Sequence, residues 1–216
     1  MTTPLLHDYY RSSAAYRVRI ALNLKGIDYD RRSVNLAEGA QKQDAYRALS
    51  PQGFVPMLEI DGLKLTQSLA IAVYLDQKFP DPALMPRDPA DGAHVRALAM
   101  TVACDIHPLN NLRVLKYLGG TLGVTQEQSD AWYVHWVTEG LAALEALAAP
   151  RAGAFLFGDS PGLAAVCLVP QLYNARRFAV PIALYPALCR ADESASAHPA
   201  FAAAHPDLIA QQDVAQ

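Results

Sequence analysis

The chain has 216 residues, of which 52% are hydrophobic and 18% are charged. This composition is typical of a soluble globular protein rather than a disordered one. The net charge of −3 excludes the strongly basic character of most nucleic-acid-binding proteins. No apolar run reaches the roughly 18 residues of a membrane-spanning helix, and the first ten residues lack the segments of a signal peptide. We therefore expect a cytoplasmic protein that binds neither nucleic acid nor membrane.

The cysteines indicate neither a metal site nor a disulfide framework. Cys104, Cys167 and Cys189 are widely spaced, with no Cys-x-x-Cys pair and no Cys/His spacing of the kind that binds zinc. We expect reduced thiols in the core of a cytosolic protein, and no metal.

The first eighty residues predict a small mixed sheet covered by helices. Asp61-Gly62 is a strong hairpin turn between the last two strands. Apolar residues at Tyr16, Ile20 and Leu24 mark the buried face of the first helix. The expected elements are a strand at 5–9, a helix at 13–25, a strand at 29–34, a short helix at 41–49, strands at 55–60 and 63–66, and a helix at 68–79.

A stretch rich in proline, Pro80 to Asp91, separates this region from a second one that is helical throughout. One apolar stripe contains Val95, Leu98, Val102, Ile106 and Leu109, and a second contains Trp132, Trp136, Leu144 and Leu147. A third helix is expected at 161–178. We therefore predict an α/β domain at 1–82, a linker at 83–91 and an all-α domain at 92–216.

The segment from Arg11 to Ile20 carries the first chemical signal. Ser12 and Ser13 follow a strand and open a helix, so their hydroxyls lie at the positive end of the helix dipole. Such a position favours an anion, and a thiol bound there would have a lowered pKa. The alternative is ordinary helix capping, for which serine is a preferred residue.

Five blocks of sequence, in this order, resemble the zeta class of the glutathione transferases, the class of maleylacetoacetate and maleylpyruvate isomerases. They are Arg11-Ser12-Ser13 with Arg17-Val18-Arg19-Ile20-Ala21-Leu22, Val55-Pro56, Gln67-Ser68-Leu69-Ala70-Ile71, Asp105-Ile106-His107-Pro108-Leu109-Asn110-Asn111, and Cys167-Leu168-Val169-Pro170-Gln171 with Asn174-Ala175-Arg176-Arg177-Phe178. The resemblance implies a thioredoxin-like glutathione-binding domain, a helical substrate-binding domain, glutathione as cofactor and a homodimer. The Asp105 to Asn111 block is most similar to the bacterial maleylpyruvate isomerases.

Two positions depart from the pattern of the family. Ala14 stands where zeta members often have cysteine, but the thiolate comes from glutathione in the family's scheme, so the main expectation is unchanged. Gly162 and Ala165 stand where these folds usually have a Ser/Thr-x-x-Asp capping box. We expect Ser160, followed by Pro161, to cap that helix instead, with about 1 kcal/mol less support than a full box.

The resemblance also implies which residues bind glutathione. Val55-Pro56 is expected to be a cis bond in a turn that pairs with the extended peptide. Gln67 and Ser68 are expected to hold the γ-glutamyl carboxylate at a helix N-terminus, where plain capping is the alternative. From the helical domain, Asp105, His107 and Asn111 are expected to reach glutathione, across a dimer interface for the first two. The alternative for Asp105 and His107 is a surface aspartate and a hydrogen-bonded histidine, and Pro108 is expected to kink their helix.

The substrates of the family are dicarboxylates with a cis double bond, which require fixed positive charge. Arg11, Arg113 on the long helix, and Arg177 are the candidates, and Arg177 is preferred to Arg176. Arg17 and Arg19 are interpreted as structural. The implied reaction is thiolate addition to the alkene, rotation about the resulting single bond, and loss of thiolate, with Ser12, Ser13 and Arg11 as catalytic residues.

Two competing functions remain open at this stage. The same thiolate site would serve a transferase or dehalogenase that conjugates glutathione to small electrophilic acids. A non-catalytic module that keeps the fold for protein contacts is disfavoured by the intact serines and arginines. Disulfide exchange is disfavoured because the redox position has no cysteine. The sequence does not separate maleylpyruvate from maleylacetoacetate.

Overall fold

The computed structural model describes residues 3–214, which form two units. The first unit contains residues 3–84 together with 197–214, and the second contains residues 85–196. The elements of the first unit are β1 (Leu5–Asp8), α1 (Ser13–Leu24), β2 (Asp30–Ser33), the 3-10 helix η1 (Ala40–Lys42), α2 (Asp44–Arg47), β3 (Met57–Ile60), β4 (Leu63–Thr66), α3 (Ser68–Lys78), α10 (Pro199–Ala203) and α11 (Pro206–Val214).

The four strands form one mixed sheet in the order β2-β1-β3-β4. β1 and β2 are parallel, and β3 is antiparallel to both β1 and β4. A parallel pair needs a long crossover connection, which α1 supplies. Asp61 and Gly62 both have positive φ in the tight turn between β3 and β4. The small mixed sheet that the sequence predicts is confirmed.

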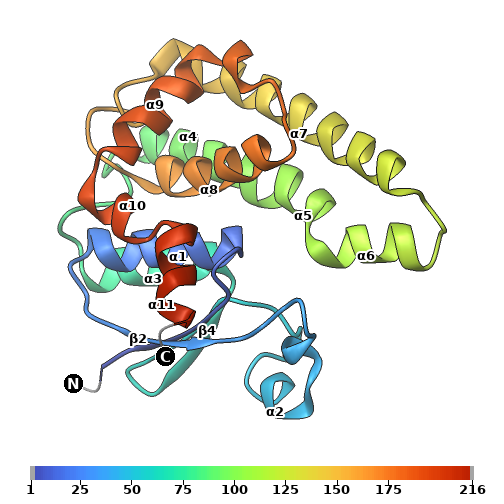
Figure 1. Cartoon of the computed structure of the whole chain (residues 1–216). Helices are drawn as coiled ribbons and strands as arrows, with labels where there is room; N and C mark the ends of the chain where they lie inside the picture. The colour runs from blue at the N-terminus through green and yellow to red at the C-terminus, as the bar shows by residue number, and fades with distance from the viewer. Residues whose placement is uncertain (1–2, 215–216) are drawn as a thin grey trace. The chain divides into compact units, whose positions relative to one another are not determined.

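The helices α1 and α3 pack against each other on one face of this sheet (Figure 1). The three predicted residues of α1, Tyr16, Ile20 and Leu24, are all buried. Most other residues of α1 are buried as well, so this helix is enclosed on more than the face that the apolar spacing predicts.

The C-terminal segment from Ala197 onward packs with the first unit, whereas the sequence analysis assigns it to the second domain. Arg19 of α1 donates from Nε to the Ala204 carbonyl at 3.1 Å, and α10 packs against α1. Farther along, Arg31 of β2 forms an ion pair of 3.0 Å with Asp213 of α11. A helical pattern shows that a segment is helical but not which core it covers, so this difference is not visible in the sequence.

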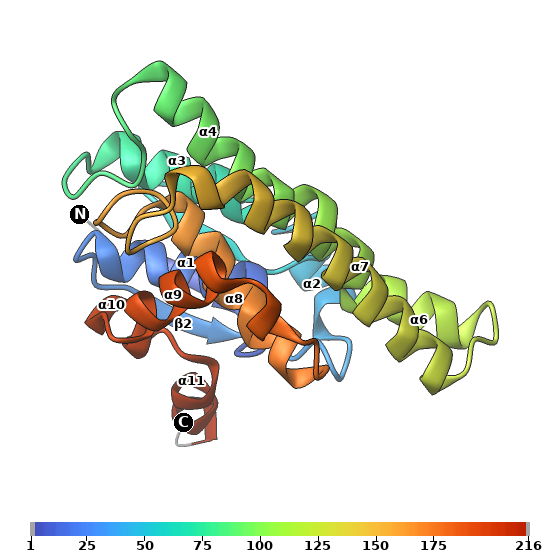
Figure 2. The same ribbon diagram turned by 90° about the horizontal axis from the view of Figure 1, so that it is seen from above.

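Residues 85–196 form helices joined by loops. The elements are α4 (Pro89–Met100), the π-helix η2 (Thr101–Ile106), α5 (His107–Asn110), α6 (Leu112–Gly120), α7 (Gln126–Ala148), the 3-10 helix η3 (Ala149–Arg151), α8 (Leu163–Arg177), the 3-10 helix η4 (Ile182–Leu184) and α9 (Pro186–Ser196). Figure 2 shows α4 and α7 side by side. Every residue of α8 from Leu163 to Leu172 is buried, so α8 lies at the centre of this unit. In the described part of the chain, no helix is both long enough and apolar enough to cross a bilayer.

Two boundaries differ from the sequence prediction. The helix expected at 41–49 consists of η1 and α2, separated by Gln43 in an extended conformation. The linker expected at 83–91 is shorter, because Asp88 caps α4 and Pro89 is its first residue. Proline is well tolerated there because the first N–H groups of a helix have no partner within the helix.

The helix after the linker is not one regular α-helix. The first four residues of its predicted stripe, Val95, Leu98, Val102 and Ile106, are buried. A π-helical turn, η2, nevertheless follows α4, and Pro108 lies in the first turn of α5. Proline has no N–H to donate to the carbonyl four residues earlier. This explains why the regular α-helical hydrogen bonds are interrupted in the turn before Pro108. The run ends at Asn110, and Arg113, which was expected on the long helix, lies on the separate helix α6.

The buried stripe of α7 differs from the predicted one. Its apolar buried residues are Tyr133, Val137, Leu141, Leu144 and Ala148. Trp132 and Trp136 are only half-buried, and Leu147 is exposed. Trp132 donates from Nε1 to the Leu109 carbonyl at 2.9 Å. Its half-buried position therefore gives the indole N–H a hydrogen-bond partner.

The interpretation of all three cysteines as core thiols is wrong for Cys104. The three thiols are free, but only Cys167 is buried, while Cys189 is half-buried and Cys104 is exposed on η2. The apolar stripe of that helix passes through Val102 and Ile106 on either side of Cys104, so this position faces away from the core.

The predicted cap of the third long helix is also wrong. α8 begins at Leu163, and Gly162 is its N-cap without a side-chain hydrogen bond, so Ser160 and Pro161 precede the helix. A reciprocal capping box occurs at α7 instead, between Thr125 and Gln128.

Gly140 permits the close approach of α7 to η2, and we expect Gly140→Ala to destabilise the protein. A Cβ at Gly140 would lie 2.2 Å from Cγ1 and 2.6 Å from Cδ1 of Ile106, which is only 1% exposed. The overpacking should cost about 1–3 kcal/mol of unfolding free energy, measured by urea denaturation. Gly119→Ala on α6 is the matched control, because the nearest atom is 3.8 Å away, and it should stabilise by about 0.5–1 kcal/mol. Equal stability of the two variants would contradict this packing argument.

Candidate functional site

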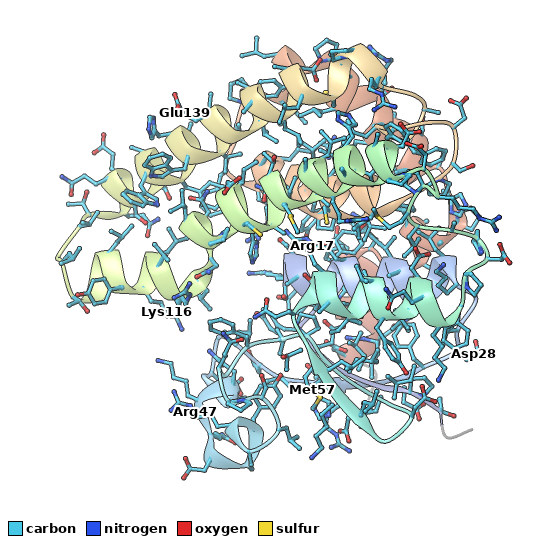
Figure 3. The ribbon with its side chains drawn as sticks, turned by 180° about the vertical axis from the view of Figure 1, so that it is seen from behind. Arg17, Asp28, Arg47, Met57, Lys116 and Glu139 are labelled. Carbon is cyan, nitrogen blue, oxygen red and sulfur yellow. The ribbon has the colours of Figure 1, made fainter. Side chains whose placement is uncertain are left out.

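The register of the sheet brings three predicted binding segments to one end. His7 of β1, Met57 of β3 and Thr66 of β4 lie abreast on adjacent strands, and Met57 is labelled in Figure 3. At this end the chain leaves β1 toward α1, enters β3 from the Val55-Pro56 loop, and leaves β4 toward α3. We call this end, marked by His7, Met57 and Thr66, the site edge. The N-termini of α1 and α3 and the loop before β3 all begin there.

Ser12 is the N-cap of α1. Its Oγ accepts the Ala15 N–H at 3.2 Å, and its own backbone N–H donates to the Tyr9 carbonyl at 2.8 Å. The Ser12 side chain is half-buried, whereas Ser13 is only 4% exposed. A hydroxyl that accepts a cap hydrogen bond still has its own hydrogen to donate. The capping interpretation is therefore confirmed for Ser12, and it is compatible with an anion at the same helix end.

The bond Val55-Pro56 is cis, as the resemblance predicts. The strand expected from 55 begins only at Met57. Two hydroxyls hold the preceding carbonyl, since Tyr46 Oη donates to Phe54 O at 2.8 Å and Ser50 Oγ donates to it at 3.0 Å. Burial raises the pKa of Tyr46 to about 12, so its phenol keeps the proton that it donates.

α3 begins at a residue with unusual backbone geometry. Gln67, its N-cap, has φ 69° and ψ 111°, a conformation that costs a non-glycine residue about 1–3 kcal/mol. Its Nε2 donates to Gln52 Oε1 at 2.8 Å, which joins the start of α3 to the loop before β3. Ser68 follows as the first helical residue and is 6% exposed. Arg17 of α1 donates from Nη1 to Ser68 Oγ at 3.4 Å.

Arg11 precedes the cap of α1 and is exposed. Its guanidinium lies 5.2 Å from the centroid of the Tyr10 ring, a cation–π distance. The structure thus gives the first unit one solvent-accessible arginine next to Ser12.

Three predicted glutathione-binding residues belong to the second unit. Asp105 is exposed on η2, and His107, the first residue of α5, is half-buried. Asn111 caps α6, where its Oδ1 accepts the Arg113 N–H at 3.1 Å and the Val114 N–H at 3.3 Å. The carbonyl side of this amide is therefore used by the fold, and its NH₂ group is the part that a ligand would meet.

The structure distinguishes Arg176 from Arg177 at the end of α8. Arg176 forms an ion pair with Asp192 of α9, whose side chain is only 4% exposed. Arg177 is exposed and donates from Nη1 to Asn174 Oδ1 at 3.1 Å. Burial raises the pKa of the Tyr133 phenol, and the positive charge of Arg177 opposes part of that rise.

Four residues that shape the site edge were not among the predicted site residues: Arg17, Tyr46, Ser50 and Gln52. Arg17 was interpreted as structural, and the others lie in loop or short-helix sequence. The only signal in the sequence is position: Tyr46, Ser50 and Gln52 lie shortly before Val55-Pro56, and Arg17 lies in the helix that begins at Ser13.

Comparisons with known proteins agree with this architecture. Residues 6–83 match the family "Glutathione S-transferase, N-terminal domain". Maleylacetoacetate isomerase of Pseudomonas aeruginosa is 50% identical over 204 residues, which cover 93% of this chain and 95% of that protein.

Two solved structures are similar over nearly the whole chain. The holo structure of a maleylpyruvate isomerase, described as a bacterial zeta-class glutathione transferase, has a TM-score of 0.92 and 43% identity, covering 94% of this chain and 97% of that one. Maleylacetoacetate isomerase of Methylobacterium extorquens AM1, with bound malonate and glutathione, has a TM-score of 0.91 and 39% identity, covering 94% and 97%. The chain belongs to the zeta class of the glutathione transferases, the class that contains the maleylacetoacetate and maleylpyruvate isomerases.

Proposed function

We propose that this protein is a glutathione-dependent cis–trans isomerase of a small cis-unsaturated dicarboxylic acid, maleylpyruvate or maleylacetoacetate. The observation that carries the proposal is the site edge, where two helix N-termini, each with a serine, begin beside a cis-proline loop. Relatives at 43% and 50% identity carry these two enzyme names.

The residues of the site edge suit the three parts of glutathione. The positive end of α1 and the Ser12 hydroxyl suit a thiolate. The loop at Val55 suits an extended peptide backbone, because a chain can pair with it as an added strand. The N-terminus of α3, with Gln67 and Ser68, suits the γ-glutamyl carboxylate. The M. extorquens relative holds glutathione together with malonate, a small dicarboxylate.

When bound, glutathione supplies a thiolate nucleophile that is regenerated in each turnover. The Ser12 hydroxyl and the first N–H groups of α1 stabilise the thiolate and so lower the pKa of the thiol. Ser13, the first residue of α1, belongs to the same helix end. Ala14 supplies no polar group, and none is required of it because the nucleophile is not a residue of the protein.

The substrate carboxylates are held by arginines. We assign this role to Arg11, Arg113 and Arg177, as the resemblance to the family implies. A guanidinium binds a carboxylate through two parallel hydrogen bonds and orients it as well as neutralising it. Arg11, next to Ser12, also stabilises the negative charge that develops on the substrate carbonyl as the alkene is attacked.

We further propose a cytoplasmic homodimer in which Asp105, His107 and Asn111 contribute to glutathione binding. Asp105 is exposed on η2, so the described part of its own unit does not cover it. Sedimentation velocity on the purified full chain measures the oligomeric state, and a monomer at micromolar concentration contradicts this part of the proposal.

The decisive experiment follows the absorbance of each cis acid with substoichiometric glutathione. An isomerase should convert many equivalents of acid per glutathione and leave the thiol concentration unchanged. Stoichiometric loss of thiol would instead identify a conjugating transferase or dehalogenase. A failure to turn over either acid while glutathione still binds would contradict the isomerase assignment.

A further inference from the structure

We propose that Arg17 is a positioning residue for the γ-glutamyl carboxylate of glutathione, and that it acts through Ser68. The inference rests on the proposed function, because it assigns a role within the glutathione site of the first unit. It differs from the sequence interpretation, which treats Arg17 as structural.

The argument starts from the position of Arg17. The residue lies in α1 and is only 2% exposed, and Figure 3 labels it on that helix. Its Nη1 lies 3.4 Å from Oγ of Ser68, the first residue of α3, whose side chain is itself buried. The guanidinium therefore reaches the helix end that we assign to the carboxylate.

This contact directs the Ser68 hydroxyl. A serine hydroxyl has a single hydrogen to donate, and its oxygen accepts. Because Arg17 donates to that oxygen, the hydrogen of Ser68 is available for another acceptor. A charged donor also polarises the hydroxyl and strengthens the bond that it makes onward. Ser68 is thereby prepared to donate to an anion.

The charge of Arg17 adds to the effect of the helix. The N-terminus of α3 carries a partial positive charge, and a cation behind Ser68 raises the potential at the same place. Both groups are shielded from water, so screening by solvent is weak. A carboxylate at Ser68 is therefore stabilised by the hydroxyl, the helix end and the guanidinium together.

Arg19 shows what a structural arginine on the same helix looks like. Its Nη1 donates to both carboxylate oxygens of Asp8 at 2.7 and 2.8 Å, and further donors meet the carbonyls of Tyr10 and Ala204. The Arg19 charge is thus matched by a buried carboxylate inside the fold. Arg17, by contrast, donates to Ser68, a residue that we assign to glutathione binding.

The test compares two ligands by calorimetry, S-methylglutathione and the same peptide with 4-aminobutyrate in place of γ-glutamate, which lacks only the carboxylate. Wild-type protein should prefer S-methylglutathione. Arg17→Met should weaken binding of S-methylglutathione about 10-fold, the value of one charge-assisted hydrogen bond, and leave the affinity for the analogue within about twofold. Ser68→Ala should reduce the same preference. Asn23→Ala, which removes the bond from α1 to the Ala200 carbonyl, should leave both affinities unchanged.

The outcomes separate a carboxylate role from a packing role. Equal losses for both ligands in Arg17→Met would overturn the inference, because packing does not distinguish them. If Arg17→Met fails to fold, Arg17→Gln removes the charge but keeps a polar side chain, and an unchanged preference in that variant overturns the inference as well. Wild-type protein that binds neither peptide contradicts the proposed function itself. A preference that persists in Arg17→Met but is reduced in Ser68→Ala contradicts only this inference.

Discussion

Ser12→Ala is expected to lower kcat/KM for the cis acid about 100-fold at pH 7, with glutathione still bound. Removal of one donor from a preorganised anion site typically costs a factor of this size. The half-buried Ser12 hydroxyl, which caps α1 through the Ala15 N–H, retains a hydrogen for the thiolate. Steady-state kinetics with each acid, together with calorimetry of glutathione, separate the loss in catalysis from a loss in binding.

The pH dependence of Ser12→Ala provides a second readout. A donor that favours the thiolate lowers the pKa of the bound thiol, so its loss must raise that pKa. The acid limb of the pH–rate profile should therefore move to higher pH, and activity lost at pH 7 should be partly recovered at alkaline pH. An unchanged profile with a uniformly lower rate would indicate damage to the fold rather than loss of a thiolate donor.

The matched controls separate capping from catalysis. Ser12→Ala also removes a helix cap, which should cost about 1 kcal/mol of stability. Ser12→Thr keeps both the hydroxyl and the cap, so its activity should stay within about 10-fold of wild type. Ser13→Ala should have the smaller effect of the two alanine variants, since the Ser13 side chain is 4% exposed. A reversed order would transfer the role of thiolate donor to Ser13.

The strand order and the cis-proline loop illustrate how far the sequence alone leads. Alternating apolar patterns and the Asp61-Gly62 turn are local signals, and each predicts its own element. Once β3 is antiparallel to both neighbours, the register places the N-termini of α1 and α3 at the site edge. The elements of the sheet with α1 and α3, and the grouping of the site residues at the site edge, therefore follow from local signals and topology. The cis state of Val55-Pro56 followed only from the resemblance.

The features that the sequence did not reveal depend on contacts between distant residues. Arg17 and Arg19 both lie on the first helix, and nothing local shows that one meets Ser68 while the other meets Asp8. The assignment of the C-terminal helices to the first unit depends in the same way on partners such as Arg31. Pro108 predicts an irregularity in the long helix. It does not predict that a separate helix, α6, begins after Asn111, because that depends on the cap hydrogen bonds that Asn111 accepts.

Arg177→Ala is expected to raise KM for the dicarboxylate about 10- to 100-fold and to leave the affinity for glutathione unchanged. The variant removes a charge-assisted hydrogen-bonding group that we assign to one substrate carboxylate. Arg177 is exposed at the end of α8, held by Asn174 Oδ1 rather than by a carboxylate, so its charge is available to an anion. Arg177→Lys should recover only part of the loss, because an ammonium does not form the bidentate contact.

The neighbouring arginine is the control that gives this prediction its specificity. Arg176→Ala removes a charge of the same kind from the adjacent position, but that charge is paired with Asp192. Burial raises the pKa of Asp192, although the bond from Arg176 opposes this, so removal of Arg176 leaves a buried carboxyl that protonates more readily. Because Arg176 is half-exposed, the variant should lose only about 1–2 kcal/mol of stability, with KM for the diacid nearly unchanged. If both alanine variants raised KM equally, the effect would be that of general positive charge at the end of α8, and the assignment of Arg177 to a substrate carboxylate would be wrong.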